Sequence, residues 1–263
     1  MRRLATGFAV AGLLAATTVV GRADTQPACD APLALLRLAN PLVHLARKLA
    51  SHLPVTIVAI GSSSTAGAGA SSPSANYPSR LEAELRRTFP AKSITVINRG
   101  IGGEEIGDML KRFDSAIVAE KPDLVLWQLG TNSVIRNHPM NDHGALIRAG
   151  LAKIRSTGAD IVLIDPQYAP KVINKPEVEP MLELISFTAK QENVDLFRRF
   201  AVMKHWHDED RMEFAAFVSR DGLHMNDWSY ACMAKGLATA IAEAASRPVM
   251  SARVAPGQLF DVP

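Results

Sequence analysis

The amino-acid sequence predicts one α/β domain: a doubly wound parallel sheet, flavodoxin-like in class, with helices on both faces that make three α/β/α layers. Two observations predict this fold. Short, continuous apolar runs alternate along the chain with longer segments in which apolar residues recur at helical spacing. Polar and glycine-containing turns directly follow the apolar runs, at the edge where doubly wound sheets bind their ligands.

Five apolar runs are predicted to be the strands of this sheet. Each run is largely continuous instead of alternating between apolar and polar residues, which is typical of parallel strands that are buried on both faces. The predicted strands cover residues 55–60, 93–98, 123–129, 160–165 and 194–197.

Helices are predicted before, between and after these strands. Residues 31–53 read as a leucine-rich helix interrupted near Pro41, because proline inside a helix removes a backbone hydrogen bond. In residues 77–89, Pro78 takes a helix-starting position and Leu81 and Leu85 share one face. The same apolar spacing predicts the other helices at residues 104–120, 144–158, 177–191 and 226–245.

The two ends of the chain differ from this pattern. Residues 1–23 have two arginines before an apolar stretch and small residues at a cleavage position after Ala23, which predicts a secretory signal peptide and a periplasmic or secreted protein. An uncleaved membrane anchor is the alternative, since the apolar stretch is about long enough to span a bilayer. The remaining chain is predicted to form a helical extension (24–53), the main domain (54–247) and a tail (248–263) without periodicity.

The charge balance argues against nucleic acid as a partner. The whole chain has a formal charge of +3, from 29 basic and 26 acidic residues. Cleavage after Ala23 removes Arg2, Arg3 and Arg22 and no acid, which leaves 26 residues of each sign. A neutral protein without a basic run lacks the electrostatic footprint of a nucleic-acid-binding protein. No stable membrane insertion is expected after signal cleavage, and the expected partner is a small-molecule or polysaccharide ester.

The two cysteines, Cys29 and Cys232, are an even number in a chain predicted to be exported. Such a compartment favours a disulfide, which would tie the start of the mature chain to the last helix. Two buried free thiols are the alternative.

The turns at the predicted carboxyl edge contain the groups that acyl transfer requires: a nucleophile, a base, a group that orients the base, and oxyanion donors. A serine cluster, GSSSTAG at 61–67, follows the first strand. His224 can act as the base, and Asp221, three residues earlier, can orient its ring. Asn132 offers a side-chain N–H and Gly103 a backbone N–H for the oxyanion.

Four sequence blocks resemble those of the SGNH hydrolases, also called GDSL esterases and lipases. They are GSSSTAG (61–67), NRGIGG (98–103), GTN (130–132) and DGLH (221–224). The resemblance implies a Ser63–His224–Asp221 triad, with Ser63 as the nucleophile. It also implies an oxyanion hole formed by the backbone N–H groups of Ser63 and Gly103 and the side chain of Asn132. Gly102 is the alternative one position earlier, and neither a metal nor a cofactor is implied.

One residue departs from the family pattern. The first block of the family reads Gly-Asp-Ser, whereas this chain has Gly-Ser-Ser-Ser, so Ser62 occupies the aspartate position. An α/β-hydrolase is a weaker match, because its Gly-x-Ser-x-Gly motif would need glycine where Thr65 stands. His205 and His207 lie in a charged stretch without cysteine and are interpreted as a solvated helix end instead of a metal site.

The sequence therefore predicts a serine esterase that hydrolyses small acyl esters, with O-acetyl groups on carbohydrate favoured by export and by the lack of an amphipathic lid. A lysophospholipase or thioesterase, with an apolar groove lined by residues 166–180, is one alternative. An O-acyltransferase with the same residues is another. A non-catalytic glycan-binding module would be expected to have lost one member of the triad, and all three are present.

Overall fold

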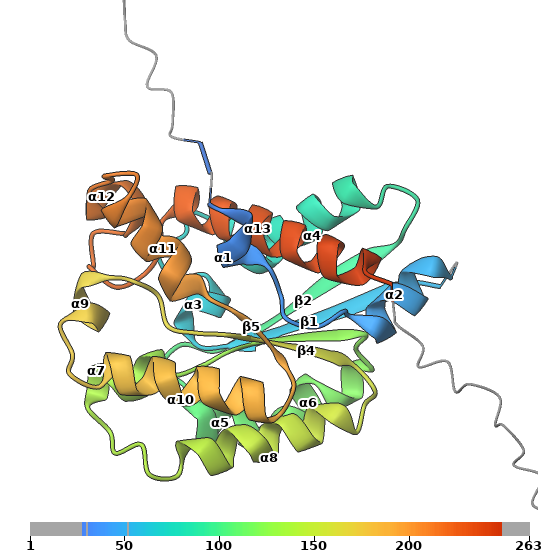
Figure 1. Cartoon of the computed structure of the whole chain (residues 1–263), viewed down its shortest axis with the longest axis horizontal. Helices are drawn as coiled ribbons and strands as arrows, with labels where there is room; N and C mark the ends of the chain where they lie inside the picture. The colour runs from blue at the N-terminus through green and yellow to red at the C-terminus, as the bar shows by residue number, and fades with distance from the viewer. Residues whose placement is uncertain (1–27, 30, 52, 249–263) are drawn as a thin grey trace, which may run out of the picture.

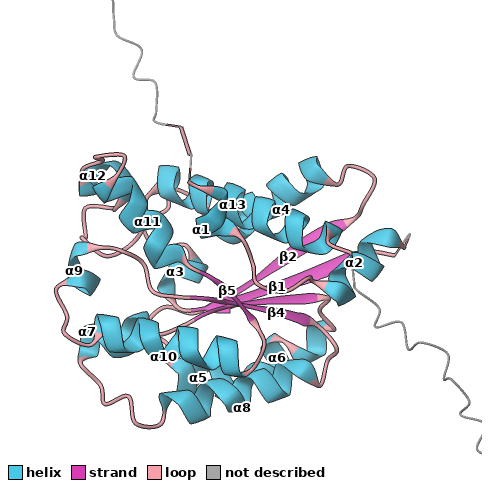
Figure 2. Cartoon of the chain, in the orientation of Figure 1, coloured by secondary structure: helices cyan, strands magenta, loops and turns pink. Residues whose placement is uncertain are grey.

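The computed structural model describes residues 28–29, 31–51 and 53–248, which form three layers around one parallel sheet (Figures 1 and 2). The strands are β1 (Val55–Gly61), β2 (Ile94–Gly100), β3 (Leu124–Gln128), β4 (Asp160–Ile164) and β5 (Asp195–Phe197). They are all parallel, in the order β2-β1-β3-β4-β5. This is the flavodoxin-like order, so the predicted fold class is confirmed.

Helices pack on both faces of the sheet (Figure 1). One face is covered by α1 (Leu33–Leu36), α4 (Tyr77–Thr88), α11 (Arg199–Asp208) and α13 (Asp227–Ser246). The other is covered by α5 (Ile106–Lys111), α6 (Phe113–Ala116), α8 (His143–Arg155) and α10 (Val178–Gln191). Every residue of β3 is buried, and so are six of the seven in β1, which is why these strands read as continuous apolar runs.

The helix predicted at residues 104–120 is divided in the structure. It becomes α5, α6 and a 3₁₀ turn at Val118–Glu120, with the break at Arg112, whose φ of −115° and ψ of 8° leave the helical region. The Arg112 guanidinium donates to the carbonyl of Arg99, 2.8 Å away, and forms an ion pair with Glu104. The helix therefore breaks at the residue whose side chain bonds to the end of β2. The spacing of apolar residues in the sequence does not show this break.

The segment before β1 closes the amino-terminal edge of the sheet. It contains α2 (Val43–Ala50), and the predicted interruption near Pro41 falls between α1 and α2. Three aspartates at the starts of the last three strands accept backbone N–H groups. Asn40 N donates to Asp195 at 2.8 Å, Leu45 N to Asp160 at 2.9 Å and Thr56 N to Asp123 at 2.8 Å. Asp123 and Asp195 are buried and Asp160 is partly buried, and all three are hydrogen-bonded, as burial of a charged group requires.

Some predictions fall on residues that the structure does not describe. The proposed signal peptide (1–23) lies wholly outside the described residues, and so does the tail from residue 249 onward. None of the helices in the described part of the chain combines the length and the apolar composition that a membrane span needs.

A disulfide joins the start of the described chain to α13. Cys29 and Cys232 are bonded, with their Cα atoms 5.0 Å apart and a sequence separation of 203. Closing so long a loop restricts the unfolded chain strongly, which in the chain-entropy model stabilises the folded state.

When the oxidised protein is unfolded in denaturant without reductant, we expect Cys29 and Cys232 to resist alkylation. After reduction, both should react. Reduction, or the Cys29→Ser/Cys232→Ser double substitution, should lower the free energy of unfolding by about 2–5 kcal/mol. Mass spectrometry and denaturant titration measure the two effects. Two alkylated cysteines in the unreduced sample would contradict the pairing.

Candidate active site

The turn after β1 places Ser63 at the carboxyl edge of the sheet. Ser63 is the first residue of the short helix α3 (Ser63–Ala66), which begins two residues after β1 ends and lies opposite α2 along the sheet (Figure 1). The end of β2 passes very close to this helix: a Cβ atom on Gly100 would lie 2.1 Å from the backbone nitrogen of Ala66. Only glycine allows β2 to approach the Ser63 turn so closely.

Ser63, His224 and Asp221 form a continuous line of hydrogen bonds. His224 Nε2 lies 2.8 Å from Ser63 Oγ, and His224 Nδ1 lies 2.5 Å from Asp221 Oδ2. The structure thus brings together three side chains from opposite ends of the chain, in the arrangement of a nucleophile, a base and an orienting carboxylate.

Asp221 also fixes the turn that carries His224. Its Oδ1 atom accepts Ser219 Oγ at 2.7 Å and the backbone N–H groups of Leu223 and His224 at 2.9 Å each. Burial on its own would raise the pKa of Asp221, but the hydrogen bonds from His224, Ser219 and the backbone hold that pKa well below its usual range. The Asp221 carboxylate is therefore ionised at neutral pH.

Of the predicted oxyanion residues, those in the loop after β2 come close to Ser63. A Cβ atom on Gly102 would lie 3.9 Å from Ser63 Cβ, and Gly103 follows with Arg136 Nη2 next to it. Asn132, in the first turn of α7 (Thr131–Arg136), donates one Nδ2 hydrogen to the Glu104 carbonyl at 2.7 Å. This bond orients the amide and leaves its second N–H available to an oxyanion.

Glu105 connects the loop after β2 to α7. Its carboxylate accepts Ser133 Oγ at 3.0 Å and Arg136 Nη1 at 2.6 Å, and it lies 2.9 Å from His138 Nδ1. Burial raises the pKa of Glu105, but the hydrogen bonds from Arg136, His138 and Ser133 outweigh it and lower that pKa. These bonds attach Glu105, and with it the preceding residues Gly103 and Glu104, to the helix that contains Asn132.

A buried polar network links α7 to the His224 turn. Gln167, fully buried, accepts Thr131 Oγ1 at 3.0 Å and Arg199 Nη2 at 2.9 Å and donates to the Leu223 carbonyl at 3.2 Å. Thr131 and Leu223 directly precede Asn132 and His224 in the chain. Gln167 therefore connects the backbone beside the predicted oxyanion donor to the backbone beside the predicted base.

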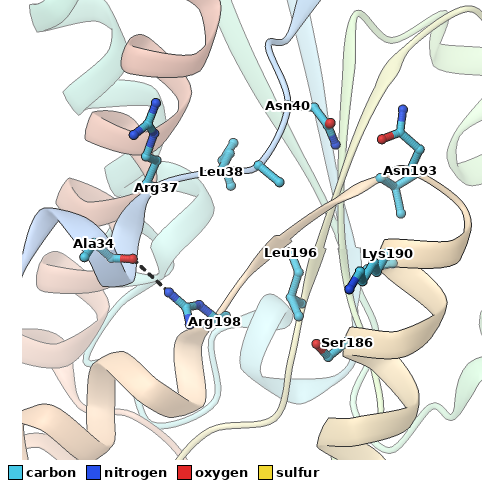
Figure 3. Close-up of a pocket in the computed structure, with 12 residues that line it drawn as sticks. Ala34, Arg37, Leu38, Asn40, Ser186, Lys190, Asn193, Leu196 and Arg198 are labelled. Carbon is cyan, nitrogen blue, oxygen red and sulfur yellow. Dashed lines mark hydrogen bonds between the residues drawn. The ribbon is translucent and has the colours of Figure 1, made fainter.

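A hollow of about 570 Å³ lies between α1, α10 and β5, away from Ser63 (Figure 3). Arg198 Nη2 donates to the Ala34 carbonyl there at 2.8 Å. The residues lining this hollow include no member of the predicted site.

Among the described residues, no three His, Cys, Asp or Glu side chains gather as metal ligands. His207, partly exposed in the last turn of α11, bonds the Met212 carbonyl and stacks on Phe214.

A family model matches residues 28–247 of this chain, and it describes the non-GDSL lipase-like family. The chain belongs to this family. The similarity to SGNH (GDSL) hydrolases predicted from the four sequence blocks is thereby confirmed. The match covers the described helices before β1 as well as the sheet, and so includes the predicted helical extension from residue 28 onward.

Two curated relatives of this family member are esterases. An acetylxylan esterase of Geobacillus stearothermophilus is 27% identical over 107 residues, which are 37% of this chain and 47% of that enzyme. An arylesterase of Vibrio mimicus is 26% identical over 142 residues, 52% of this chain and 66% of that enzyme. The chain spans between about half and two thirds of the length of these relatives.

Solved structures share the fold at lower identity. A two-domain esterase active on acetylated mannans, crystallised with mannopentaose, superposes with a TM-score of 0.68 at 20% identity, covering 81% of this chain and 56% of that one. A putative lipolytic protein of the G-D-S-L family from Desulfitobacterium hafniense has a TM-score of 0.61 at 24% identity, covering 71% and 99%. The three-layer fold is therefore that of known esterases.

Substitution of Asp221 by asparagine tests its orienting role. The asparagine side chain would keep an oxygen for the turn but present an N–H to His224 Nδ1, which favours the tautomer that cannot accept a proton from Ser63. We expect kcat on a nitrophenyl ester to fall by about 10³- to 10⁴-fold with an unchanged melting temperature. Asp114→Asn, on the exposed end of an ion pair with Lys153, is the matched control and should retain full activity. A loss of less than about tenfold would reduce Asp221 to a turn-stabilising residue.

Proposed function

We propose that this protein is a serine esterase that removes small acyl groups, chiefly O-acetyl groups, from carbohydrate. The observation that carries the proposal is the hydrogen-bonded line from Ser63 through His224 to Asp221. We assign Gly103 and Asn132 as the oxyanion donors. Nucleophile, base, orienting group and oxyanion donors are the complete set that acyl transfer uses. Membership of the non-GDSL lipase-like family and the esterase relatives support the same reaction class.

In the proposed first half-reaction, Ser63 Oγ attacks the ester carbonyl carbon while His224 Nε2 takes its proton. The carbonyl oxygen becomes an oxyanion between the Ser63 and Gly103 N–H groups and the Asn132 side chain. Collapse of this intermediate breaks the bond to the leaving alcohol, which receives the proton from His224, and leaves an acyl group on Ser63. Removing one oxyanion donor from such a site typically costs about 3 kcal/mol of transition-state stabilisation.

In the second half-reaction, water attacks the acyl carbon and gives a proton to His224. The new intermediate collapses, the bond to Ser63 Oγ breaks, and Ser63 recovers its proton from His224. The acid is released and the site is restored. Throughout, the ionised Asp221 stabilises the imidazolium of His224.

The carbohydrate acetyl substrate is favoured by the relatives, which include an acetylxylan esterase and an esterase active on acetylated mannans. It is also consistent with the predicted export of the protein. The arylesterase relative favours a second candidate, an esterase that accepts broader or longer acyl groups. The two candidates differ in how activity depends on acyl chain length.

Ser63 should be the residue that reacts with a fluorophosphonate probe. We expect peptide mass spectrometry to place the adduct on Ser63, and Ser63→Ala to abolish labelling and activity. Ser64→Ala is the matched control, because Ser64 is the next serine, is buried, and has no side-chain hydrogen-bond partner among the described residues. It should label as the unmodified protein does. An adduct on Ser62 or Ser64 would show that the register of the motif is wrong.

Activity should be greatest on acetyl esters and fall steeply by butyrate or hexanoate. In a short acyl pocket each added methylene meets a wall, whereas in an open groove each adds about 0.8 kcal/mol of transfer free energy. The kcat/KM values of nitrophenyl esters of increasing length, together with acetate release from acetylated xylan and mannan, measure this. A rise from acetate to octanoate would favour a lipid or thioester hydrolase.

A further inference from the structure

The residue that departs from the family pattern, Ser62, is bonded to a single buried acceptor. Ser62 is 1% exposed, and both its backbone N–H and its hydroxyl donate to Gln128 Oε1, at 2.9 and 3.2 Å. An aspartate in this position would be an acceptor only and would meet the oxygen of Gln128 without a proton between them. The serine at position 62 thus fits the glutamine on the neighbouring strand.

Gln128 reaches the Ser63 turn on both sides of Ser63. It is the last residue of β3 and is fully buried, and its Oε1 atom also accepts Thr65 Oγ1 at 3.2 Å. The side chain crosses the end of β1 so closely that a Cβ atom on Gly61 would lie 2.7 Å from Gln128 Oε1. The two hydrogen-bonded residues, Ser62 and Thr65, lie before and after Ser63 in the chain.

We propose that Gln128 is a positioning residue for Ser63. Its side-chain carbonyl, by accepting three hydrogen bonds from Ser62 and Thr65, fixes the turn that aims Ser63 Oγ at His224. Gln128 itself does not contact the substrate in this proposal, which rests on the proposed serine-esterase function. Because the three donors converge on one oxygen in a buried site, losing that oxygen leaves all three without this acceptor.

Two substitutions separate the acceptor from the volume of the side chain. Gln128→Met keeps a similar length but removes the acceptor. Gln128→Glu keeps an acceptor oxygen, and the Nε2 atom that it replaces has no hydrogen-bond partner among the described residues. Ile154→Ala, a core truncation in α8 far from the turn, is the control for a loss of stability alone. Each variant is assayed for kcat and KM on nitrophenyl acetate, for the rate constant of fluorophosphonate labelling, and for melting temperature.

We expect Gln128→Met to lower kcat and the labelling rate constant by about 10- to 100-fold with KM nearly unchanged, since a small misplacement of a reacting group has effects of this size. Gln128→Glu should recover most of both, and Ile154→Ala should lower the melting temperature without lowering either. Rates within threefold of the unmodified protein in Gln128→Met, or equal losses in the Met and Glu variants, would overturn the proposal while leaving the esterase function intact. Unmodified protein that neither labels at Ser63 nor hydrolyses esters would overturn both.

Discussion

The close contact between the Ser63 turn and the ends of two neighbouring strands is the constraint on which the site depends. β2 approaches through Gly100, whose missing side chain leaves room for the backbone of Ala66. β3 approaches through Gln128, whose side chain needs Gly61 beneath it. Because parallel strands end at a common edge, this packing places Ser63 within reach of the loops that carry Gly103, Asn132 and His224.

Buried polar side chains have different roles at the two edges of the sheet. At the amino edge, Asp195 and Asp160 accept backbone N–H groups from the segment around α2, and Asp123 accepts one from β1, which leaves that edge covered. At the carboxyl edge, the buried side chain of Gln128 bonds to the Ser63 turn, and that of Gln167 bonds to Thr131 and to the His224 turn. Ser63 and His224 themselves stay partly exposed. A functional group needs rigid support beneath it and open space above it, and this arrangement provides both.

The sequence predicted the fold and the residues of the candidate site to different degrees. Strands and most long helices were predictable because their apolar periodicity reflects burial on one or two faces. Ser63, Asn132, Asp221 and His224 were predictable because each lies in a short motif. Gln128, Gln167 and Glu105 were missed, because each contacts a segment distant in sequence. Arg112 was missed because its contacts with Arg99 and Glu104 leave no trace in the apolar spacing of the helix. The one available signal was a glutamine within the otherwise apolar run DLVLWQL.

The sequence by itself determined the alternation of strands and helices and the order of the four motifs, since both depend on residue type and local spacing. Only the tertiary structure decided that Ser63, His224 and Asp221 form one hydrogen-bonded line. It also decided that Ser62 faces Gln128, and that a glutamine and an arginine, Gln167 and Arg199, join the loops behind the site. The physical reason is that a hydrogen bond requires a suitable direction and a distance correct to within a few tenths of an ångström. Such geometry arises only when segments far apart in the chain pack side by side.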